Sequence, residues 1–463
     1  MRVVGVIDIG KTNAKVAAVD LDRFEEIAVR KTANAVLTDS PYPHFDVEHL
    51  WAFLLESLAA LHAEHAFEAI SITTHGATAV VLDASGNLAL PVLDYEHAGP
   101  DSLAAEYDQV RPPFSETGSA RLPMGLNVGA QLYWQQKTFP DAFVRVASIL
   151  TYAQYWTYRL TGTLCNELTS LGCHTDLWNP RAGTFSSLVE SQGWEPLFAP
   201  VLKASDIAGA LRPELCAATG IASGTPVYCG IHDSNASLLP HLLTRAAPFS
   251  VVSTGTWVVM LAVGAEARAL DEHRDTLVNV NALGDPVPSA RFMGGRAFQL
   301  LLGAGAAVPV SPETEEAVAK AGHMLLPSIP EGSGPFPAAK AIWTTDEEEL
   351  DPAERFVVVS FHLALMTATC LGLIGARGDI VVEGPFASNG TYLRMLAAAT
   401  GRPVFADPHN ITGTSLGAAC LVKGSAVRTG VEPLVGEIAE SLATYAQAWQ
   451  KATQDHAGKE KRP

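Results

Sequence analysis

A carboxylate and a glycine turn stand together near the start of the chain, and these residue types could hold a metal ion and a phosphate. Asp8 ends an apolar, β-branched segment typical of a buried strand, where a carboxylate is costly unless it binds a partner. A divalent cation or its water shell is a natural partner. Gly10 allows a sharp turn, after which backbone N–H groups, the Thr12 hydroxyl and the Lys15 ammonium could face phosphate oxygens. A hairpin turn with an exposed Asp8 is the alternative.

The same turn formally matches the P-loop pattern, with Gly5 followed by four residues and then Gly10-Lys11-Thr12. A P-loop needs loop residues between its glycines and a helix after them. Here residues 6–9 are Val-Ile-Asp-Ile, which predict a strand, and residues 13–19 are again closer to a strand than to a helix. We therefore interpret the segment as a strand, a tight turn and a second strand.

The elements around this turn indicate an α/β fold that occurs twice. Apolar residues at helical spacing predict a helix over 47–61 with Asp46 as its N-cap, and a strand follows around 70–72. A second strand-turn-strand unit covers 249–263, with Ser253-Thr254-Gly255-Thr256 at its turn. Because this unit has the same pattern as the first, we predict a duplicated α/β architecture with a boundary near 240–248.

The composition is that of a globular protein, and its charge disfavours nucleic acid and membrane partners. The chain has 463 residues, 48% hydrophobic and 17% charged, which is enough for two cores. A net charge of −18 repels nucleic acid phosphates and anionic membranes. The uncharged run 356–376 could span a bilayer by length, but we expect a buried helix between the two domains. The six cysteines lack metal-ligand spacing and the N-terminus lacks a signal-peptide pattern, which favours free thiols in a cytoplasmic protein.

Five blocks of sequence follow one another in a characteristic order. They cover residues 8–15, 74–78, 230–234, 253–257 and 382–404, and a helix-like segment at 414–419 closes the series. Each block alone is a weak signal, but their order and spacing together resemble the FGGY family of carbohydrate kinases, within the actin–hexokinase–Hsp70 superfamily. The second block is similar to the xylulokinase form and the third to the rhamnulokinase form.

This resemblance implies two RNase-H-like (actin-like ATPase) domains with a cleft between them. The sugar-binding domain would cover 1–240, the ATP-binding domain 241–430, and a C-terminal helix with a disordered tail 431–463. ATP, Mg²⁺ and a small sugar are the implied ligands, with Asp8 as the metal-associated acid, and a homodimer is left open. The implied nucleotide contacts are Gly10, Lys11, Thr12, Asn13 and Lys15 of the first turn, Gly255 and Thr256 of the second, and Gly384 and Asn389.

Within the third block, Asp233 fits the role of catalytic base. A sugar hydroxyl is a weak nucleophile that must lose its proton during phosphoryl transfer, and a carboxylate within hydrogen-bond reach can take it. Asp233 follows a short apolar strand and precedes a predicted helix, so an N-cap is the alternative role, compatible with the first. The implied sugar contacts are Thr74, His75, Gly76, Glu96, His232 and Asp233, with structural histidines and ordinary loop acids as the alternatives.

Four departures from the family pattern leave roles open. Lys11 stands where the family usually has Thr, with the β- or γ-phosphate as one possible target. Asp94-Tyr95-Glu96 replaces a Trp-Asn-Asp-like segment, and Pro385 replaces the second glycine of the adenosine turn. Gly76-Ala77 replaces the Arg-Glu pair of glycerol kinases, which argues against glycerol as the substrate.

We therefore predict an ATP-dependent kinase for a small sugar, most simply a ketopentose, ketohexose or deoxyketose. An ATP-binding sensor or a chaperone-like ATPase of the same fold is the alternative class, and a P-loop NTPase is a third. The particular sugar and the hydroxyl that is phosphorylated stay open, because a few polar residues set the stereochemical preference of such a site.

Overall fold

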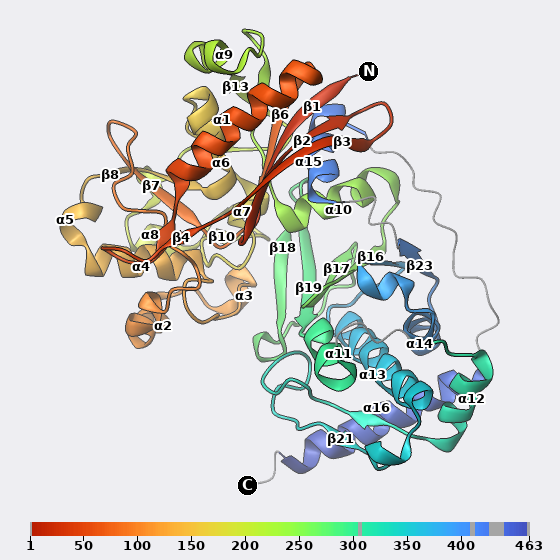
Figure 1. Ribbon diagram of the computed structural model, residues 1–463. Helices are drawn as coiled ribbons and strands as arrows, with labels where there is room; N and C mark the ends of the chain where they lie inside the picture. Colours follow the sequence, from red (N-terminus) through yellow and green to blue (C-terminus); the bar gives the residue numbers. More distant parts are fainter. Residues whose placement is uncertain (1, 304–307, 408–412, 426–438, 461–463) are drawn as a thin grey trace. The chain divides into compact units, whose positions relative to one another are not determined.

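The computed structural model describes residues 2–303, 308–407, 413–425 and 439–460. For residues 457–460 it describes the backbone alone. These residues form two compact units (Figure 1). Unit 1 contains residues 2–245, 278–286 and helix α15 (Thr414–Lys423), and unit 2 contains the rest. The main division lies between Arg245 and Ala246. Residues 278–286 and α15 pack with unit 1, although both lie within the range 241–430 that the resemblance assigned to the second domain.

The central sheet of unit 1 has the order β13-β14-β6-β1-β2-β3, with β15 paired beside β6. Strands β1, β6, β14 and β15 run parallel, and β2 and β3 are antiparallel additions. Their bounds are β1 (Val3–Ile9), β2 (Asn13–Asp20), β3 (Glu25–Ala33), β6 (Phe67–Thr74), β13 (Ile207–Ala210), β14 (Pro226–Tyr228) and β15 (Ile231–His232). Every residue of β1 is buried, as expected for a strand that is covered on both faces.

Helices cover both faces of this sheet. Successive side chains of a strand point to opposite faces, and in these strands both sets are apolar. Ile7 and Ile9 belong to a core with α1 (Val47–Glu64), α6 (Tyr152–Thr161) and α9 (Pro213–Thr219), whereas Val4 and Val6 belong to a core with α10 (Asp233–Thr244) and α15. The predicted helix at 47–61 is confirmed as α1, and the Asp46 side chain caps it by accepting from the His49 N–H at 3.0 Å.

The rest of unit 1 consists of short elements around a third core. Its helices are α2 (Ala104–Val110), α3 (Phe114–Thr117), α4 (Val128–Thr138), α5 (Pro140–Phe143), α7 (Leu168–Leu171) and α8 (Ser187–Ser191). Two-stranded sheets pair β4 (Val36–Leu37) with β5 (His44–Phe45), β7 (Ala79–Asp83) with β8 (Val146–Thr151), β9 (Asn166–Glu167) with β12 (Val201–Leu202), and β10 (Trp178–Asn179) with β11 (Thr184–Phe185).

The sheet of unit 2 has the order β18-β19-β17-β16-β22-β23. Its strands are β16 (Phe249–Thr254), β17 (Val258–Val263), β18 (Thr276–Val280), β19 (Pro286–Phe292), β22 (Asp379–Glu383) and β23 (Val404–Asp407). A small sheet pairs β20 (Leu325–Leu326) with β21 (Ile342–Trp343). The helices are α11 (Gly294–Leu302), α12 (Pro312–Ala321), α13 (Pro352–Leu373), α14 (Gly390–Thr400) and α16 (Glu440–Glu460).

The two main sheets have the same pairing pattern. In unit 1, β14, β6 and β1 are parallel neighbours, and β2 and β3 then follow antiparallel. In unit 2, β23, β22 and β16 are parallel neighbours, and β17 and β19 follow antiparallel. The two predicted strand-turn-strand units are β1–β2 and β16–β17, which occupy equivalent places. The predicted duplication is therefore confirmed at the level of the sheets.

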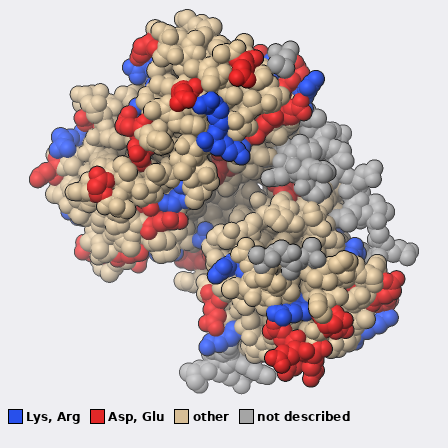
Figure 2. Space-filling view, viewed as in Figure 1, with Lys and Arg blue, Asp and Glu red and all other residues tan. Residues whose placement is uncertain are grey.

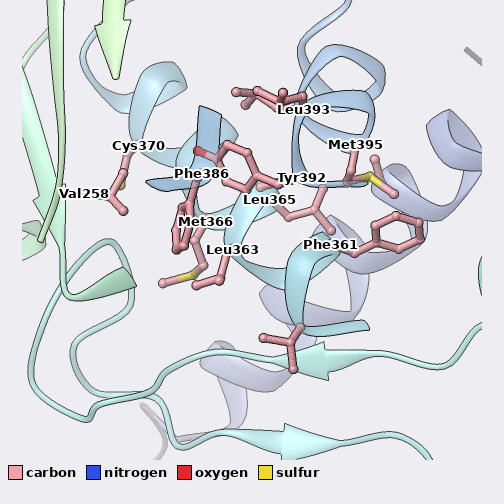
Figure 3. Close-up of a cluster of buried hydrophobic side chains, with 14 of the residues drawn as sticks. Val258, Phe361, Leu363, Leu365, Met366, Cys370, Phe386, Tyr392, Leu393 and Met395 are labelled. Atoms are coloured by element: carbon pink, nitrogen blue, oxygen red, sulfur yellow. The ribbon is translucent and has the colours of Figure 1, made fainter. Parts of the chain in front are cut away.

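The uncharged run 356–376 falls mainly in α13, which is long and apolar enough to cross a membrane by length and composition. Of that apolar stretch 78% is buried in the structure, as in the core helix of a globular unit. Figure 3 shows its Phe361, Leu363 and Met366 among Phe386 and Tyr392. The predicted burial is confirmed, but α13 packs against α11, α12, α14 and β17, all within unit 2, and so is not a helix between domains.

Two further expectations concern the surface and the tail. On the face drawn in Figure 2, acidic and basic side chains are dispersed over both units, so the net charge of −18 is not concentrated at one element there. The predicted C-terminal helix is α16, which continues to Glu460. Of the disordered tail expected after this helix, residues 461–463 lie outside the described residues.

Candidate active site

Three parallel strands of unit 1 end side by side. Ile9 of β1 pairs with Thr74 of β6, and Thr74 pairs with His232 of β15. The residues that follow these strand ends are Gly10, His75 and Asp233, so the register brings three separate sequence blocks to one edge of the sheet. This edge is where ligands bind in many open α/β sheets.

Asp8 lies one residue before this edge and is 8% exposed. Its Oδ2 accepts hydrogen bonds from the hydroxyls of Thr414 and of Ser415 (3.1 Å), at the start of α15, and Lys15 Nζ lies 3.5 Å away. Burial, with the charge of Asp233 adding to it, holds the pKa of Asp8 above its ordinary value although these three partners oppose the shift.

The arrangement around Asp8 suits a metal that is held through water rather than by direct ligands. Among the described residues no group of three or more His, Cys, Asp or Glu side chains is placed to hold a metal ion. Mg²⁺ commonly keeps most of its waters and takes one or two carboxylates together with substrate phosphates. A single carboxylate that already accepts two hydroxyl hydrogen bonds fits only that outer role, and the assignment of Asp8 to Mg²⁺ stays a prediction.

The turn between β1 and β2 is held by its own backbone and by Asn34, which the sequence did not single out. Gly10 N–H donates to Asn13 O at 2.9 Å, the Asn34 amide donates to Gly10 O at 2.8 Å, and Asn34 N–H donates to Thr12 O at 2.9 Å. Thr12 and Asn13 remain exposed at the tip. Because β2 begins at Asn13, no helix follows the turn, and the P-loop alternative is excluded.

Lys11 points to a different set of residues from its neighbours in the turn. Its ammonium donates to Asp94 and lies 3.4 Å from Glu96 Oε2. It also lies 5.0 Å from the centre of the Phe45 ring and 4.9 Å from that of Tyr95. Lys11 is predicted to contact the nucleotide, but its described contacts include Glu96, which is predicted to contact the sugar.

His75 lies within an aromatic cluster next to these acids. Its ring centre is 5.2 Å from Phe45, 5.3 Å from Tyr95 and 4.9 Å from Tyr152. Nδ1 contacts Gly76 O at 2.8 Å, whereas Nε2 is buried without a hydrogen-bond partner among the described residues. Burial lowers the pKa of His75 to about 4, so the ring is neutral at pH 7. An unpartnered buried nitrogen is costly and marks a place for a ligand hydroxyl.

Asp233 is the first residue of α10, and the N-cap position itself is His232. Its Oδ1 accepts from the Ser234 N–H at 2.6 Å and lies 3.1 Å from His232 Nε2, while 31% of its side chain is exposed. Burial alone would raise the pKa of Asp233, but the charge and hydrogen bond of His232 hold it below its ordinary value. The carboxylate is therefore ionised at neutral pH and reachable, as a general base must be.

His232 is held in its charged form by Cys173 and Asp233. Burial would lower its pKa, but the Cys173 thiolate and the Asp233 carboxylate raise it well above its ordinary value. The close approach of Gly76 explains why a glycine is needed there, since a Cβ at position 76 would lie 2.7 Å from His232 Nε2. Thr74, predicted to contact the sugar, donates its hydroxyl to His75 O at 3.0 Å instead.

A buried acid that the sequence did not single out supports this loop. Glu167 accepts from the Thr169 hydroxyl at 2.6 Å and from its N–H at 2.8 Å, and the Thr169 hydroxyl accepts from the His232 N–H at 3.0 Å. Burial raises the pKa of Glu167 to about 7. Glu167 caps α7, and only the tertiary structure reveals that this short helix holds the backbone next to Asp233.

The equivalent edge of unit 2 is built from glycines. Gly255 and Thr256 are exposed at the β16–β17 turn, where Gly255 N–H donates to Trp257 O at 2.9 Å. A Cβ on Gly295 would lie 2.0 Å from Gly255 O, and one on Gly384 (φ +78°) would lie 2.1 Å from Thr254 O. Three backbone segments therefore meet closely around the turn. Within this cradle of close-packed backbone, the exposed Thr256 hydroxyl is a donor that suits phosphate oxygens.

Asn389 has a structural role at this edge. Its side-chain oxygen accepts from the Tyr392 N–H at 3.0 Å and caps α14, and its amide nitrogen donates to Ser360 Oγ at 3.0 Å. The predicted adenosine contact therefore competes with these two hydrogen bonds. Arg296 donates its backbone N–H to Thr256 O at 3.3 Å and has an exposed side chain.

The two units thus supply complementary chemistry. Unit 1 offers an ionised carboxylate, an unpartnered neutral imidazole and further acids, which suit a polyhydroxylated molecule. Unit 2 offers an exposed Gly-Thr turn in a backbone cradle, which suits phosphates. Two sheets that share five strands in the same pairing pattern, with these edges, define the class of protein with two actin-like ATPase domains.

Comparison with known proteins specifies the family. Residues 3–240 match the N-terminal domain of the FGGY family of carbohydrate kinases, and residues 246–430 match the carbohydrate kinase FGGY C-terminal domain. A carbohydrate kinase from Novosphingobium aromaticivorans has 35% identity and a TM-score of 0.90, covering 98% of this chain and 99% of that one. The chain belongs to the FGGY family of carbohydrate kinases.

More distant relatives carry more specific names. The chain is 25% identical over 269 residues to an L-fuculokinase of Salmonella typhi and 26% identical over 274 residues to a probable L-xylulose kinase of Pasteurella multocida. These matches cover 56% of this chain and 56% and 55% of those proteins, so it aligns with little more than half the length of these curated relatives. A xylulose kinase of Rhodospirillum rubrum has the same fold, with 20% identity, a TM-score of 0.76, and 99% and 98% coverage.

Proposed function

We propose that the chain transfers a phosphoryl group from ATP to a hydroxyl of a small ketose, a ketopentose, ketohexose or deoxyketose, with Asp233 as the general base. The observation that carries this proposal is the state of Asp233. It is ionised, partly exposed and fixed at 3.1 Å from His232, at the strand edge that also holds an unpartnered buried His75 nitrogen.

Asp233 would accept the proton of the sugar hydroxyl as that oxygen attacks the γ-phosphorus. His232 orients the carboxylate through the contact with Oδ1, and its charge keeps the carboxylate ionised at the cost of some basicity. A weaker base is sufficient because phosphoryl transfer demands positioning and charge neutralisation more than proton abstraction.

Sugar recognition would fall to the polar groups around this base. Neutral His75 offers Nε2 to one hydroxyl, and the carboxylates of Asp94 and Glu96 offer acceptors to others. Gly76 contributes by leaving room for His232. Thr74 shapes the strand end through its bond to His75 O.

The proposed nucleotide contacts fall on an exposed turn in each unit, taken by itself. In unit 2, Gly255 and Gly384 would let the backbone come close to the nucleotide and the exposed Thr256 would offer its hydroxyl. In unit 1, the exposed Thr12 and Asn13 would contact phosphate, with Lys15 adding charge beside Asp8. Mg²⁺ bound with ATP would neutralise charge on the phosphates, and Asp8 could hold it through water. We also propose a cytoplasmic location, where ATP is available, and a homodimer stays open.

A ketose panel tests the proposal, and its members are selected by the names of the relatives and by the xylulokinase-like and rhamnulokinase-like sequence blocks. Purified protein is incubated with Mg-ATP and L-fuculose, L-xylulose, D-xylulose or L-rhamnulose, and ADP release and the mass of the sugar product are measured. We expect sugar-dependent ADP release and a sugar phosphate with at least one of them. ATP binding without transfer to any sugar or polyol would instead support the sensor or chaperone-like ATPase.

A further inference from the structure

Lys11 has a position and a set of contacts that the phosphate turn does not explain. Its ammonium donates to Asp94 and lies 3.4 Å from Glu96 Oε2. Phe45 and Tyr95 present their rings to it at 5.0 and 4.9 Å. The Lys11 side chain is 18% exposed and that of Asp94 is 11% exposed, so this pair is screened from solvent far more than a surface ion pair.

These contacts consume most of the capacity of the ammonium group. Lysine has three N–H donors and one positive charge, and here two carboxylates share that charge. One ammonium and two carboxylates leave a net negative charge, which would repel a phosphate. Lys11 is therefore poorly suited to bind ATP. Lys15, whose Nζ lies 3.5 Å from Asp8 Oδ2, is the better candidate for a phosphate contact.

The partners of Lys11 connect directly to the catalytic edge. The Tyr95 ring lies 5.3 Å from the His75 ring, whose buried Nε2 has no partner among the described residues. Burial raises the pKa of Tyr95, and the charges of Glu96, Asp233 and Asp94 add to that rise. Both described hydrogen bonds to the Asp94 carboxylate, from Lys11 and from the Glu96 N–H at 3.1 Å, use Oδ1, which leaves Oδ2 as the expected acceptor for a ligand.

We propose that Lys11 is a positioning residue of the sugar subsite, where it holds Asp94 and Glu96 beside Tyr95 so that their oxygens accept hydrogen bonds from sugar hydroxyls. This inference rests on the proposed kinase function and specifies which half of the reaction Lys11 serves. Without the ammonium, the two acids repel each other and each loses its fixed orientation. The ligand class that fits is a neutral polyhydroxylated sugar, because hydroxyls donate to carboxylates whereas a sugar acid is repelled.

The test separates the two substrates by steady-state kinetics, using the ketose of the panel that gives the fastest turnover. We expect Lys11→Met to raise the KM for that ketose about 10-fold or more, which corresponds to about 1.4 kcal/mol, and to change the KM for ATP less than about twofold. Lys11→Arg should recover part of the loss, because a guanidinium can bridge two carboxylates. Lys137→Met is the matched control, since Lys137 also lies over a tyrosine ring, 5.3 Å from Tyr133, but outside this cluster.

A rise in the KM for ATP with an unchanged KM for the ketose would overturn the inference and return Lys11 to the phosphates. A double-mutant cycle with Asp94→Asn provides a second measure that does not depend on how much each variant is destabilised. If Lys11 acts through Asp94, the double variant raises the ketose KM by less than the product of the single effects, and independent effects would contradict this. A wild type inactive on every sugar would overturn the kinase proposal itself, which is a distinct outcome.

Discussion

The two main sheets have the same pairing pattern, but their functional edges are built from different material. In unit 1 the strands end in side chains that carry chemistry, namely Asp8, His75 and Asp233. In unit 2 the equivalent edge has Gly255 in its turn and Gly384 after β22. The neighbouring backbone is so close that a Cβ added at Gly384 would lie 2.1 Å from Thr254 O. If the proposed site roles hold, a duplicated scaffold carries side-chain chemistry on one copy and nucleotide binding on the other.

This difference teaches which kinds of change each edge can tolerate. At a side-chain edge, exchange of a functional group removes chemistry while the backbone survives. At a backbone edge, any side chain added to a glycine, polar or apolar, introduces a Cβ that displaces the neighbouring main chain. Substitutions designed for one edge should therefore have little effect when they are made at the other.

The largest expected effect is at Asp233. Asp233→Asn keeps the shape but removes the base, so kcat should fall by about 10²- to 10⁴-fold, the usual contribution of general base catalysis, with nucleotide binding retained. Rate assays and calorimetric titration with ATP measure the two effects. Asp83→Asn is the control, because Asp83 accepts only turn N–H groups such as Ser85 N at 2.8 Å. Retention of activity by Asp233→Asn would show that another group is the base.

A pair of glycine substitutions compares the two turns directly. Gly384→Ala forces a Cβ to 2.1 Å from Thr254 O at φ +78°, whereas in Gly10→Ala the Cβ lies 3.3 Å from Asn13 O. We expect Gly384→Ala to destabilise unit 2 by about 2 kcal/mol and to weaken ATP binding, because strained backbone carries a cost of this order. Gly10→Ala should change both much less. Thermal unfolding and ATP titration report the outcome, and equal effects would remove the proposed difference between the edges.

Each unit also contains a buried neutral histidine, which predicts a stability loss in acid. Burial lowers the pKa of His362 in α13 to about 4, as it does for His75. Because the folded pKa lies below the unfolded value of about 6.5, the unfolded chain binds more protons, and stability present above pH 6.5 is lost as the pH falls toward 4. The loss is at most about 3 kcal/mol for each histidine.

Variants separate the two histidines. His362→Gln should flatten the pH dependence of thermal unfolding between pH 6.5 and 4 without altering sugar affinity, since His362 contacts Leu325 O at 3.0 Å within the unit 2 core. His75→Gln should weaken sugar binding, because His75 Nε2 is the atom proposed to face the ligand. An unchanged acid profile in His362→Gln would contradict the assigned burial effect.

The smallest effect is expected at Asn389. Asn389→Ala removes the cap of α14 and should cost about 1 kcal/mol of stability, with a KM for ATP close to that of the wild type. Asp46→Ala, which removes the cap of α1, is the matched control in unit 1. A rise in the KM for ATP that is confined to Asn389→Ala would show that this amide does contact the nucleotide.

Local pattern was sufficient for much of the fold. The helix that became α1, the two strand-turn-strand units and the strand character of residues 13–19 all follow from periodicity and turn residues, which act over a few positions. The burial of α13 was predictable from its composition, but its place inside unit 2 was not, because composition does not identify packing partners.

The site was predictable only where its residues are adjacent in sequence. Asp233 and His232 are neighbours, and their block has a family signature. The pairing of Lys11 with Asp94 joins residues 83 positions apart, and the bond from Thr414 to Asp8 joins residues 406 positions apart. Such partners depend on how the chain returns to the sheet edge, which local sequence does not reveal. The sequence therefore groups Lys11 with Gly10 and Thr12 as a nucleotide contact.

The contact between Gly76 and His232 has a consequence for the divergence and redesign of this enzyme. Position 76 has room for a hydrogen only, because any Cβ would lie 2.7 Å from the imidazole. A larger residue at position 76, such as arginine, would have to displace the His232 ring and with it the charge beside Asp233. Under the proposed function, substrate range and the basicity of Asp233 would then be tied to each other, and these two positions would change together.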